Sequence, residues 1–339
     1  MNRRRNLIIL ITLGRLAGWI MLAVAATCLA IGLLGQAGRL DFRLDLLNQL
    51  CPLWLAPGLA AAAIAVLSGG RRRLPGAIIA GALILIGGIL LGPDLLAHRT
   101  RSAPRHDMLR VVQFNVMKEN QDTISAVDWI IAQHADVIVL EEAAGDAGAI
   151  ADALKRLYPY AADCSTNGLC STMILSRLPP TDSRPLARDD PENRRGLSAV
   201  WASFASPAGP YTVVGVHLMR PWPMGKQHDQ LRELGDDIAG LPSNRLIIAG
   251  DFNASPWSMA LREEDRRFGL ERRTRLIRTW PARFDDARQQ STPFPLLALD
   301  QIYAGPGWAT VSMRRGPSLG SDHYPLVIDL APISADKTH

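Results

Sequence analysis

Long apolar runs dominate the first third of the chain. They lie within residues 1–105, where arginine clusters are their main interruption. Each run approaches the ~20 residues that a helix needs to cross a bilayer. We therefore predict a membrane anchor over residues 1–97, with three transmembrane helices at about 16–34, 46–67 and 74–96. The first run, preceded by arginines, also fits a signal peptide, but the two further runs favour a helical bundle. Prolines make the second run the weakest.

The remaining chain alternates short apolar runs with a few amphipathic stretches. Residues 98–108 have the polar, proline-containing composition of a linker, and residues 331–339 form a polar tail. Apolar spacing predicts helices near 122–135, 146–157 and 227–239, and strands near 109–115, 137–140, 173–177, 198–204, 211–217, 246–249, 299–304, 310–313 and 324–330. No element is predicted in the arginine-rich region 263–295. Many short strands with few helices favour an α+β fold, a sandwich of two sheets with helices outside.

Charge is distributed unevenly between the two parts. The first 105 residues hold 12 of the 37 basic residues but only three of the 32 acidic ones, so their formal charge is +9 and that of the rest is −4. Non-specific nucleic-acid binders carry a basic surface, because phosphate neutralisation dominates their affinity. The C-terminal domain lacks such a charge overall, although a local basic patch is compatible with its composition. The charge therefore argues mildly against a nuclease.

Two signals favour a C-terminal domain outside the cytoplasm. Arg3–Arg5 and Arg71–Arg73 lie on the same side of the three predicted helices, and the positive-inside rule assigns that side to the cytoplasm. Arginines directly after the third helix oppose this orientation. Cys164 and Cys170 bracket a short turn-like segment, which favours a disulfide in an oxidising compartment over two unrelated free cysteines. We therefore predict an extracytoplasmic domain.

The apolar run 246–249 ends in Gly250-Asp251-Phe252-Asn253. Alternate side chains of an extended chain point to one face, so Asp251 and Asn253 can address one site. Alone, the stretch fits a turn equally well, because Gly, Asp and Asn are common in turns. Other apolar strands also end in or near polar residues, which are Asn115, Glu142, His217, Asp300, Asp322 and His323. If these ends gather at one rim of the sandwich, they form a cluster of acids, amides and imidazoles.

Such a cluster suits metal-assisted hydrolysis of phosphoesters. Carboxylate and amide oxygens hold Mg²⁺ or Mn²⁺, and the cation neutralises charge that builds on phosphate oxygens. A histidine near neutral pKa can protonate a leaving oxygen or hydrogen-bond the phosphate. A nearby carboxylate would orient such an imidazole. The pattern therefore favours a metal-dependent phosphoesterase.

Seven short motifs follow one another along the C-terminal part of the chain. They are Phe114-Asn115-Val116, Asp136–Glu142, Ile174–Arg177, Val216-His217-Leu218, Gly250–Ala254, Leu299–Ile302 and Gly320–Pro325. By these motifs and their order, residues 109–330 resemble the endonuclease/exonuclease/phosphatase superfamily. The resemblance implies a four-layer α/β-sandwich, two mixed β-sheets flanked by helices, and a divalent cation.

The resemblance also implies roles for single residues. Asn115 and Glu142 would hold the metal, with Asp322 completing the site. Asp251 and Asn253 would activate water and contact the phosphate. His217 and His323 would contact the scissile phosphate, and Asp300 would orient His323. The family usually has Gln where this chain has Glu141, so either glutamate of the pair could bind the metal, and Glu142 is our choice.

The anchor and three tryptophan-containing segments, 217–223, 255–258 and 279–281, are similar to a membrane-anchored branch that includes proteins linked to teicoplanin resistance. This similarity suggests a substrate at the outer membrane face, with a lipid-linked phosphate as a candidate. Arg220, Trp222, Trp257 and Trp280 are candidates for lining a substrate pocket, and ordinary core tryptophans are an equal alternative.

Our leading hypothesis is a multi-pass, membrane-anchored phosphoesterase that uses Mg²⁺ or Mn²⁺. It would hydrolyse a phosphate ester or anhydride at the outer face of the cytoplasmic membrane, with the lipid bilayer and the phosphate-containing substrate as partners. One alternative is an extracytoplasmic endonuclease or exonuclease with nucleic acid as partner. The other is a catalytically inactive binding protein on the same fold.

Overall fold

The chain forms two compact units in the computed structural model. The first comprises Met1–Leu96 with Trp257–Met259, and the second comprises Ala97–Pro256 with Ala260–His339. The structure describes residues 2–97, 108–164, 170–186, 196–222, 225–283 and 291–333. Nearly all of the predicted linker and most of the polar tail lie outside the described residues.

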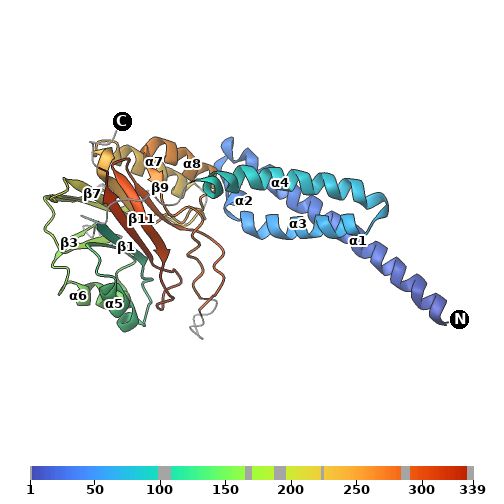
Figure 1. Cartoon of the computed structure of the whole chain (residues 1–339), viewed down its shortest axis with the longest axis horizontal. Coiled ribbons are helices and arrows are strands. Elements are labelled where there is room, and N and C mark those ends of the chain that lie inside the picture. Colours follow the sequence, from blue (N-terminus) through green and yellow to red (C-terminus); the bar gives the residue numbers. More distant parts are fainter. Residues whose placement is uncertain are drawn as a thin grey trace. The chain divides into compact units, whose positions relative to one another are not determined.

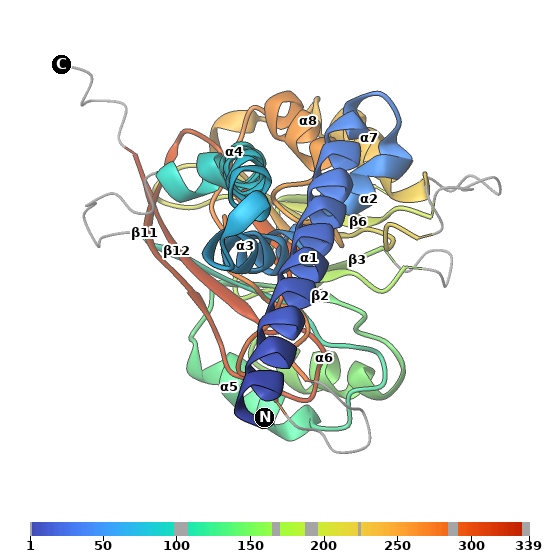
Figure 2. The ribbon, with the colours of Figure 1, turned by 90° about the vertical axis from the view of Figure 1, so that its right-hand side faces the viewer.

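The first unit is helical. Its long helices α1 (Asn2–Gln36), α3 (Cys51–Leu67) and α4 (Arg73–Leu96) pack side by side. Figure 2 shows α3 and α4 nearly end-on, with α1 crossing beside them. The short helices η1 (Ala37–Arg39), η2 (Phe42–Leu44), α2 (Asp45–Gln49) and η3 (Gly70–Arg72) connect them.

Two helices of this unit, Thr12–Arg39 and Gly70–Leu96, are long and apolar enough to cross a membrane, and a third span requires a bent pair. That pair is Phe42–Gln49 with Cys51–Leu67, which meet at 62°. The predicted segment 46–67 is therefore not one straight helix. The break lies at Leu50, directly before a helix with Pro52 in its first turn, where proline lacks the N–H needed to continue an earlier helix.

The second unit contains two mixed sheets. The first has the order β11-β12-β1-β2-β4-β3 and the second β5-β6-β7-β8-β10-β9. The strands of the first sheet are β1 (Leu109–Asn115), β2 (Val137–Glu141), β3 (Tyr160–Asp163), β4 (Met173–Ser176), β11 (Trp308–Arg315) and β12 (Leu326–Pro332). Those of the second are β5 (Asp182–Pro185), β6 (Ser198–Phe204), β7 (Tyr211–His217), β8 (Leu246–Asp251), β9 (Glu271–Arg272) and β10 (Asp300–Ala304).

Alternating side chains of the strands build three apolar layers. Val111 and Val139 face Val213 and Ile247 in the core between the sheets. Their neighbours in the sequence face outward, because successive strand residues point to opposite faces. One outer layer lies under α5 (Thr123–Ala132) and α6 (Gly148–Leu154), and the other lies under α7 (Lys226–Ile238) and α8 (Met259–Phe268). Figure 1 shows these helix pairs on opposite sides of the sheets. The second unit is therefore a four-layer α/β-sandwich.

Four of the described α-helices and β-strands of the second unit have no counterpart in the sequence-based expectation. β3 and β5 are edge strands with largely exposed residues, so they lack a buried apolar face. α8 and β9 lie in or beside the arginine-rich region where no element is predicted. α8 carries mostly charged side chains, and the few apolar ones, such as Leu261 and Phe268, are enough to anchor it. β12 extends to Pro332, beyond the predicted end of the domain at residue 330.

Strand pairing gathers the polar strand ends. β1 and β2 run parallel with Asn115 opposite Glu141, and β7 and β8 run parallel with His217 opposite Asp251. β10 runs antiparallel to β8 and begins at Asp300, opposite Asp251. Because the carboxyl ends of parallel strands meet at one edge of a sheet, these side chains share a rim of the sandwich.

Gly250 allows the strand β8 to approach its neighbour closely at this rim. A Cβ atom at this position would lie 1.8 Å from the carbonyl oxygen of Val216. No side chain fits there without moving the backbone, so glycine is required one residue before Asp251.

Candidate active site

Asp251 lies at the centre of the polar cluster. Its Oδ2 atom is 3.6 Å from Nε2 of His323 and 3.7 Å from Nε2 of His217. The side chains of Asp251 and His323 are buried, whereas that of His217 is partly exposed. A carboxylate between two imidazoles, one of which reaches solvent, is suited to acid–base work on a substrate that enters from that side.

Asp300 contacts Nδ1 of His323, whereas the other ring nitrogen, Nε2, is the one nearest Asp251. Nδ1 of His323 lies 2.8 Å from Oδ2 of Asp300. The other oxygen of Asp300 accepts a hydrogen bond of 2.8 Å from the amide of Gln113, which also donates to Glu141 at 2.9 Å. Gln113 thus joins two buried carboxyl groups and fixes the orientation of the histidine–carboxylate pair.

Glu142 and Asn115 face the open side of Asp251. Nδ2 of Asn115 lies 3.0 Å from Oδ2 of Asp251 and 3.3 Å from Oε1 of Glu142. Glu142 Oε1 is also 3.7 Å from Nε2 of His217. The oxygen of Asn115 accepts a hydrogen bond from the backbone N–H of Met117 at 3.0 Å. In this rotamer Asn115 therefore presents its NH₂ group to the cluster, and it must turn over to offer its oxygen to a cation.

Asn253 fixes the turn that follows β8. Its backbone N–H donates to Oδ1 of Asp251 at 2.8 Å, and its side chain donates to Oδ2 at 3.1 Å and to the carbonyl of Leu218 at 2.9 Å. Its φ of 48° lies in the left-handed region, which asparagine tolerates better than most residues. The side chain of Gln227 on α7 donates to the carbonyl of Asn253 at 2.7 Å and so anchors the turn.

Asp322 lies at the edge of the cluster. Its Oδ2 accepts a hydrogen bond of 3.1 Å from the indole N–H of Trp280. The neighbouring Ser321 donates to the backbone carbonyl of Asn115 at 2.6 Å and accepts from the backbone N–H of His323 at 3.0 Å. These bonds tie the Ser-Asp-His segment to the end of β1.

The buried groups have shifted pKa values. Burial raises the pKa of Asp251 despite the opposing effect of His323. Burial alone would lower the pKa of His323, but Asp300 and Asp251 outweigh it and raise that pKa well above its usual value.

Burial and the charge of Asp300 raise the pKa of Glu141 well above its usual value. For Glu142, burial is outweighed by His217 and a backbone hydrogen bond from Lys118, and its pKa is lowered. Of the two adjacent glutamates, Glu142 therefore favours its charged form more strongly than Glu141 does.

The donor set fits a hard divalent cation. Oε1 of Glu142 and Oδ2 of Asp251 both lie 3.7 Å from the same nitrogen of His217, so two carboxylate oxygens face one space. A second group, Asp251, Asp300 and His323, has its potential ligand atoms within 4.8 Å of one another. Oxygen-rich sites with room for water match the preference of Mg²⁺, which keeps part of its hydration shell.

The four residues predicted to line a substrate pocket differ in their exposure. Trp222 is 68% exposed, and Arg220 is exposed as well. Trp257 is buried, and the half-buried Trp280 holds Asp322. The bridging role of Gln113 is not among the sequence-based expectations. A glutamine inside an apolar strand is the sequence signal that could have identified Gln113, because a buried amide requires partners.

Cys164 and Cys170 form a disulfide, with their Cα atoms 5.5 Å apart. Cys170 Sγ also lies 2.9 Å from the hydroxyl of Ser198, at the start of β6. The bond therefore closes the segment between β3 and β4 next to the second sheet.

Comparison with known proteins agrees with this geometry. The Endonuclease/Exonuclease/phosphatase family model matches residues 112–323. No curated protein matches the sequence.

Several solved structures are similar to part of this chain. An endonuclease/exonuclease/phosphatase from Bacteroides vulgatus is 17% identical, covers 67% of this chain and 99% of its own, and has a TM-score of 0.51. A humanized Danio rerio TDP2 is 16% identical, covers 66% of this chain and 99% of its own, and has a TM-score of 0.50. Beta toxin from Staphylococcus aureus with bound magnesium ions is 15% identical, covers 65% of this chain and 98% of its own, and has a TM-score of 0.48.

At these identities the structural likeness shows the fold alone. The family match covers more than half of the chain and spans the whole polar cluster, from β1 to His323. The chain therefore belongs to the endonuclease/exonuclease/phosphatase family.

Proposed function

We propose that this protein is a membrane-anchored, divalent-metal-dependent phosphoesterase. One observation carries the proposal: Asp251 lies between two imidazoles, 3.6 Å from His323 and 3.7 Å from His217, and Asp300 supports His323 at 2.8 Å. Phosphoryl transfer requires mainly positioning and charge stabilisation. This arrangement offers a carboxylate base, two imidazole rings that can carry a positive charge, and carboxylates that can bind a metal ion.

Each group takes a role that its surroundings support. Asp251 is oriented by Asn253 and Asn115 and accepts the proton of the attacking water. His323 is kept protonated by Asp300 and donates a hydrogen bond to a phosphate oxygen. His217, which reaches solvent, contacts the same phosphate or the leaving oxygen. Glu142 would hold Mg²⁺ or Mn²⁺ together with water, with Asp322 and a rotated Asn115 completing the site. The cation, when bound, neutralises charge on the phosphate oxygens.

The location of the reaction is part of the proposal. Two or three apolar helices of spanning length support a membrane anchor. The arginines at the N-terminus and before α4, together with the Cys164–Cys170 disulfide, support an extracytoplasmic catalytic domain. The substrate would be a phosphate ester or anhydride presented at the outer membrane face.

A metal-dependent substrate screen tests the proposal. The full chain in detergent is treated with EDTA, dialysed and assayed with p-nitrophenyl phosphate, bis-p-nitrophenyl phosphate, pyrophosphate, a lipid phosphate and plasmid DNA. We expect turnover of at least one phosphoester to disappear with EDTA and to return with Mg²⁺ or Mn²⁺. Asp251→Ala and His323→Ala should lower it by about 10²-fold or more. Metal-loaded, folded protein that turns over none of these substrates would contradict the proposal, and preferential cleavage of DNA would instead identify a nuclease.

A further inference from the structure

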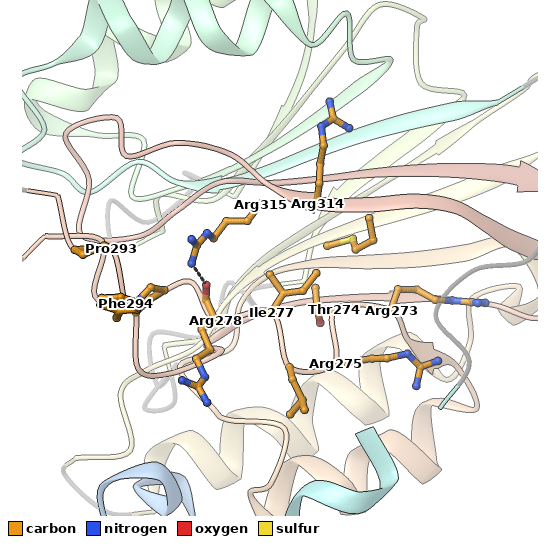
Figure 3. Close-up of a pocket in the computed structure, with 12 residues that line it drawn as sticks. Arg273, Thr274, Arg275, Ile277, Arg278, Pro293, Phe294, Arg314 and Arg315 are labelled. Atoms are coloured by element: carbon orange, nitrogen blue, oxygen red, sulfur yellow. Dashed lines mark hydrogen bonds between the residues drawn. The ribbon is translucent and has the colours of Figure 1, made fainter. Parts of the chain in front are cut away.

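A pocket of about 640 Å³ lies between the edge strand β11 of the first sheet and the segment that follows the edge strand β9 of the second sheet. None of the residues of the catalytic cluster lines it. Figure 3 shows Arg314 and Arg315 above the opening, Thr274, Ile277 and Arg278 below it, and Pro293 and Phe294 at one end. Its volume is in the range of ordinary small-ligand sites.

The charge of this pocket contrasts with that of the domain. Five arginines line it and no acidic side chain does so among the described residues, although the chain after residue 105 carries a formal charge of −4. Glu271 pairs with Arg273 and Arg275. Within the described part of the chain, Arg278 and Arg315 form no ion pair with a carboxylate. The pocket therefore keeps an unbalanced positive charge that favours an anionic ligand.

Arg315 is positioned rather than free in solvent. It points across the opening and donates a hydrogen bond of 2.9 Å to the carbonyl of Arg278 (Figure 3). Its guanidinium also lies over the ring of Tyr324, 4.2 Å from the centroid. Arg314, in contrast, points away from the opening toward Gln133. A planar guanidinium held on an aromatic ring still offers several N–H donors to a phosphate.

The floor of the same pocket is apolar. Ile277 and Met313 line it and pack from there against the core between the sheets. Leu276 lies beside them, and Phe294 is 79% exposed at the end of the pocket. An exposed phenylalanine next to an apolar floor gives a surface that a hydrocarbon chain covers favourably.

A second pocket connects this feature with the catalytic cluster. It has a volume of about 490 Å³, and Arg315 lines it as well, together with Arg283, Asp122, Gly320 and Tyr324. Gly320 and Tyr324 directly flank the Ser-Asp-His segment, and Arg283 reaches the sulfur of Met117 at 3.1 Å. Arg315 is thus shared between the apolar pocket and a polar pocket whose lining includes both residues that flank the Ser-Asp-His segment.

We propose that the two pockets together bind the substrate, and that this substrate is an anionic amphiphile. Its phosphate-bearing end lies between Arg315, Arg283 and the catalytic cluster, and its hydrocarbon chain lies along Ile277, Met313 and Phe294. This inference rests on the proposed phosphoesterase function and names its substrate class. The apolar floor favours a lipid phosphate over nucleic acid, because a polynucleotide gains little from a surface of aliphatic side chains.

Binding to an inactivated full chain tests the pockets without turnover. Asp251→Asn protein in phosphatidylcholine nanodiscs is dialysed to equilibrium against labelled octyl phosphate, inorganic phosphate or a single-stranded oligonucleotide, with empty nanodiscs as background. We expect octyl phosphate to bind about tenfold or more tightly than inorganic phosphate. In this background Arg315→Gln should weaken octyl phosphate binding about tenfold, because it removes a charged hydrogen-bond donor. Phe294→Ala should weaken it about threefold or more and leave inorganic phosphate unchanged.

Matched controls separate these pockets from general surface effects. Arg184→Gln changes an exposed arginine on the edge strand β5, and Ile124→Ala changes an apolar side chain that is 75% exposed on α5. Both should leave binding unchanged. The inference is overturned if octyl phosphate and inorganic phosphate bind equally, if the controls weaken binding as much as the pocket variants, or if the oligonucleotide binds more tightly than octyl phosphate and depends on Arg315.

The outcomes also separate this inference from the proposed function. Metal-dependent turnover of p-nitrophenyl phosphate with no effect of either pocket variant on octyl phosphate binding contradicts the pockets alone. Absence of turnover on every substrate contradicts the phosphoesterase, while tight binding of octyl phosphate that depends on Arg315 and Phe294 would still assign a lipid-phosphate site.

Discussion

Nδ1 of His323 lies 2.8 Å from Oδ2 of Asp300, and both side chains are buried. The two residues are 23 positions apart in the sequence. β10 begins at Asp300 and so supplies the carboxylate, and the segment before β12 supplies the imidazole. The pair resembles the carboxylate–histidine arrangements that hold an imidazole in one tautomer and stabilise its charged form.

Asp300→Asn should lower kcat of the metal-dependent reaction by about 10²- to 10⁴-fold with little change in KM, because the amide no longer stabilises the His323 imidazolium. The measurement is steady-state hydrolysis of the best substrate from the screen. Asp182→Asn, at an exposed carboxylate on β5, is the control and should retain activity. An Asp300→Asn protein with undiminished kcat would remove this pair from the mechanism.

The adjacent glutamates should respond differently to the same substitution. Glu142→Gln removes the carboxylate whose pKa is lowered, so we expect weaker Mg²⁺ activation, with the half-saturating metal concentration raised about tenfold or more. Glu141→Gln replaces a fully buried carboxyl whose pKa is raised well above its usual value, and it should retain metal activation because that group faces Gln113. Metal titrations of activity distinguish the two, and the reverse order of effects would reassign the ligand to Glu141.

Gly250→Ala should destabilise the second unit because its Cβ would lie 1.8 Å from the carbonyl oxygen of Val216. We expect a loss of about 2–4 kcal/mol, and thus a drop of about 5–10 °C in the unfolding midpoint. Gly148→Ala is the control, because its Cβ would meet no atom within 4 Å at the start of α6. Equal midpoints for the two variants would show that β8 tolerates a side chain at this point.

Acid should weaken the link between β1 and β12. Nε of Arg110 lies 2.6 Å from Oδ1 of Asp329. Burial would raise the pKa of Asp329, but Arg110 and Ser312 outweigh it and lower that pKa below its usual value of 3.8. Because the folded-state pKa is depressed, the stabilisation is present above pH 3.8 and is lost as the pH falls through the folded-state pKa.

Asp329→Asn should therefore cost about 1–3 kcal/mol at neutral pH and give a flatter loss of stability between neutral pH and acid. Denaturant unfolding at a series of pH values measures both effects. Asp152→Asn removes an ion pair to Lys155 on the exposed surface of α6 and should change stability little. If the Asp329→Asn protein loses stability in acid as steeply as the wild type does, other groups are responsible for the acid sensitivity.

The sequence by itself determined most of the framework of the second unit. The apolar runs in β1 and β7 predict strands, and in the structure their side chains meet either the other sheet or a helix. β1, β6 and β7 accordingly have the predicted bounds. The seven motifs in order also predicted the family, which the match to residues 112–323 confirms. These features depend on local spacing, which the sequence displays directly.

Only the tertiary structure decided how these pieces meet. The separation between Asp300 and Asp251 is set by an antiparallel register between β10 and β8, and no local pattern encodes that register. Arg315 lies on β11 and Arg278 lies in the segment after β9. They meet because an edge strand of one sheet and the segment after an edge strand of the other line the same pocket. The sequence of α8 is mostly polar and therefore predicts no helix. In the folded protein a few apolar side chains are enough to pack this helix against the second sheet. Long-range pairing and burial, which depend on residues far apart in the chain, fixed the geometry of the site and its pockets.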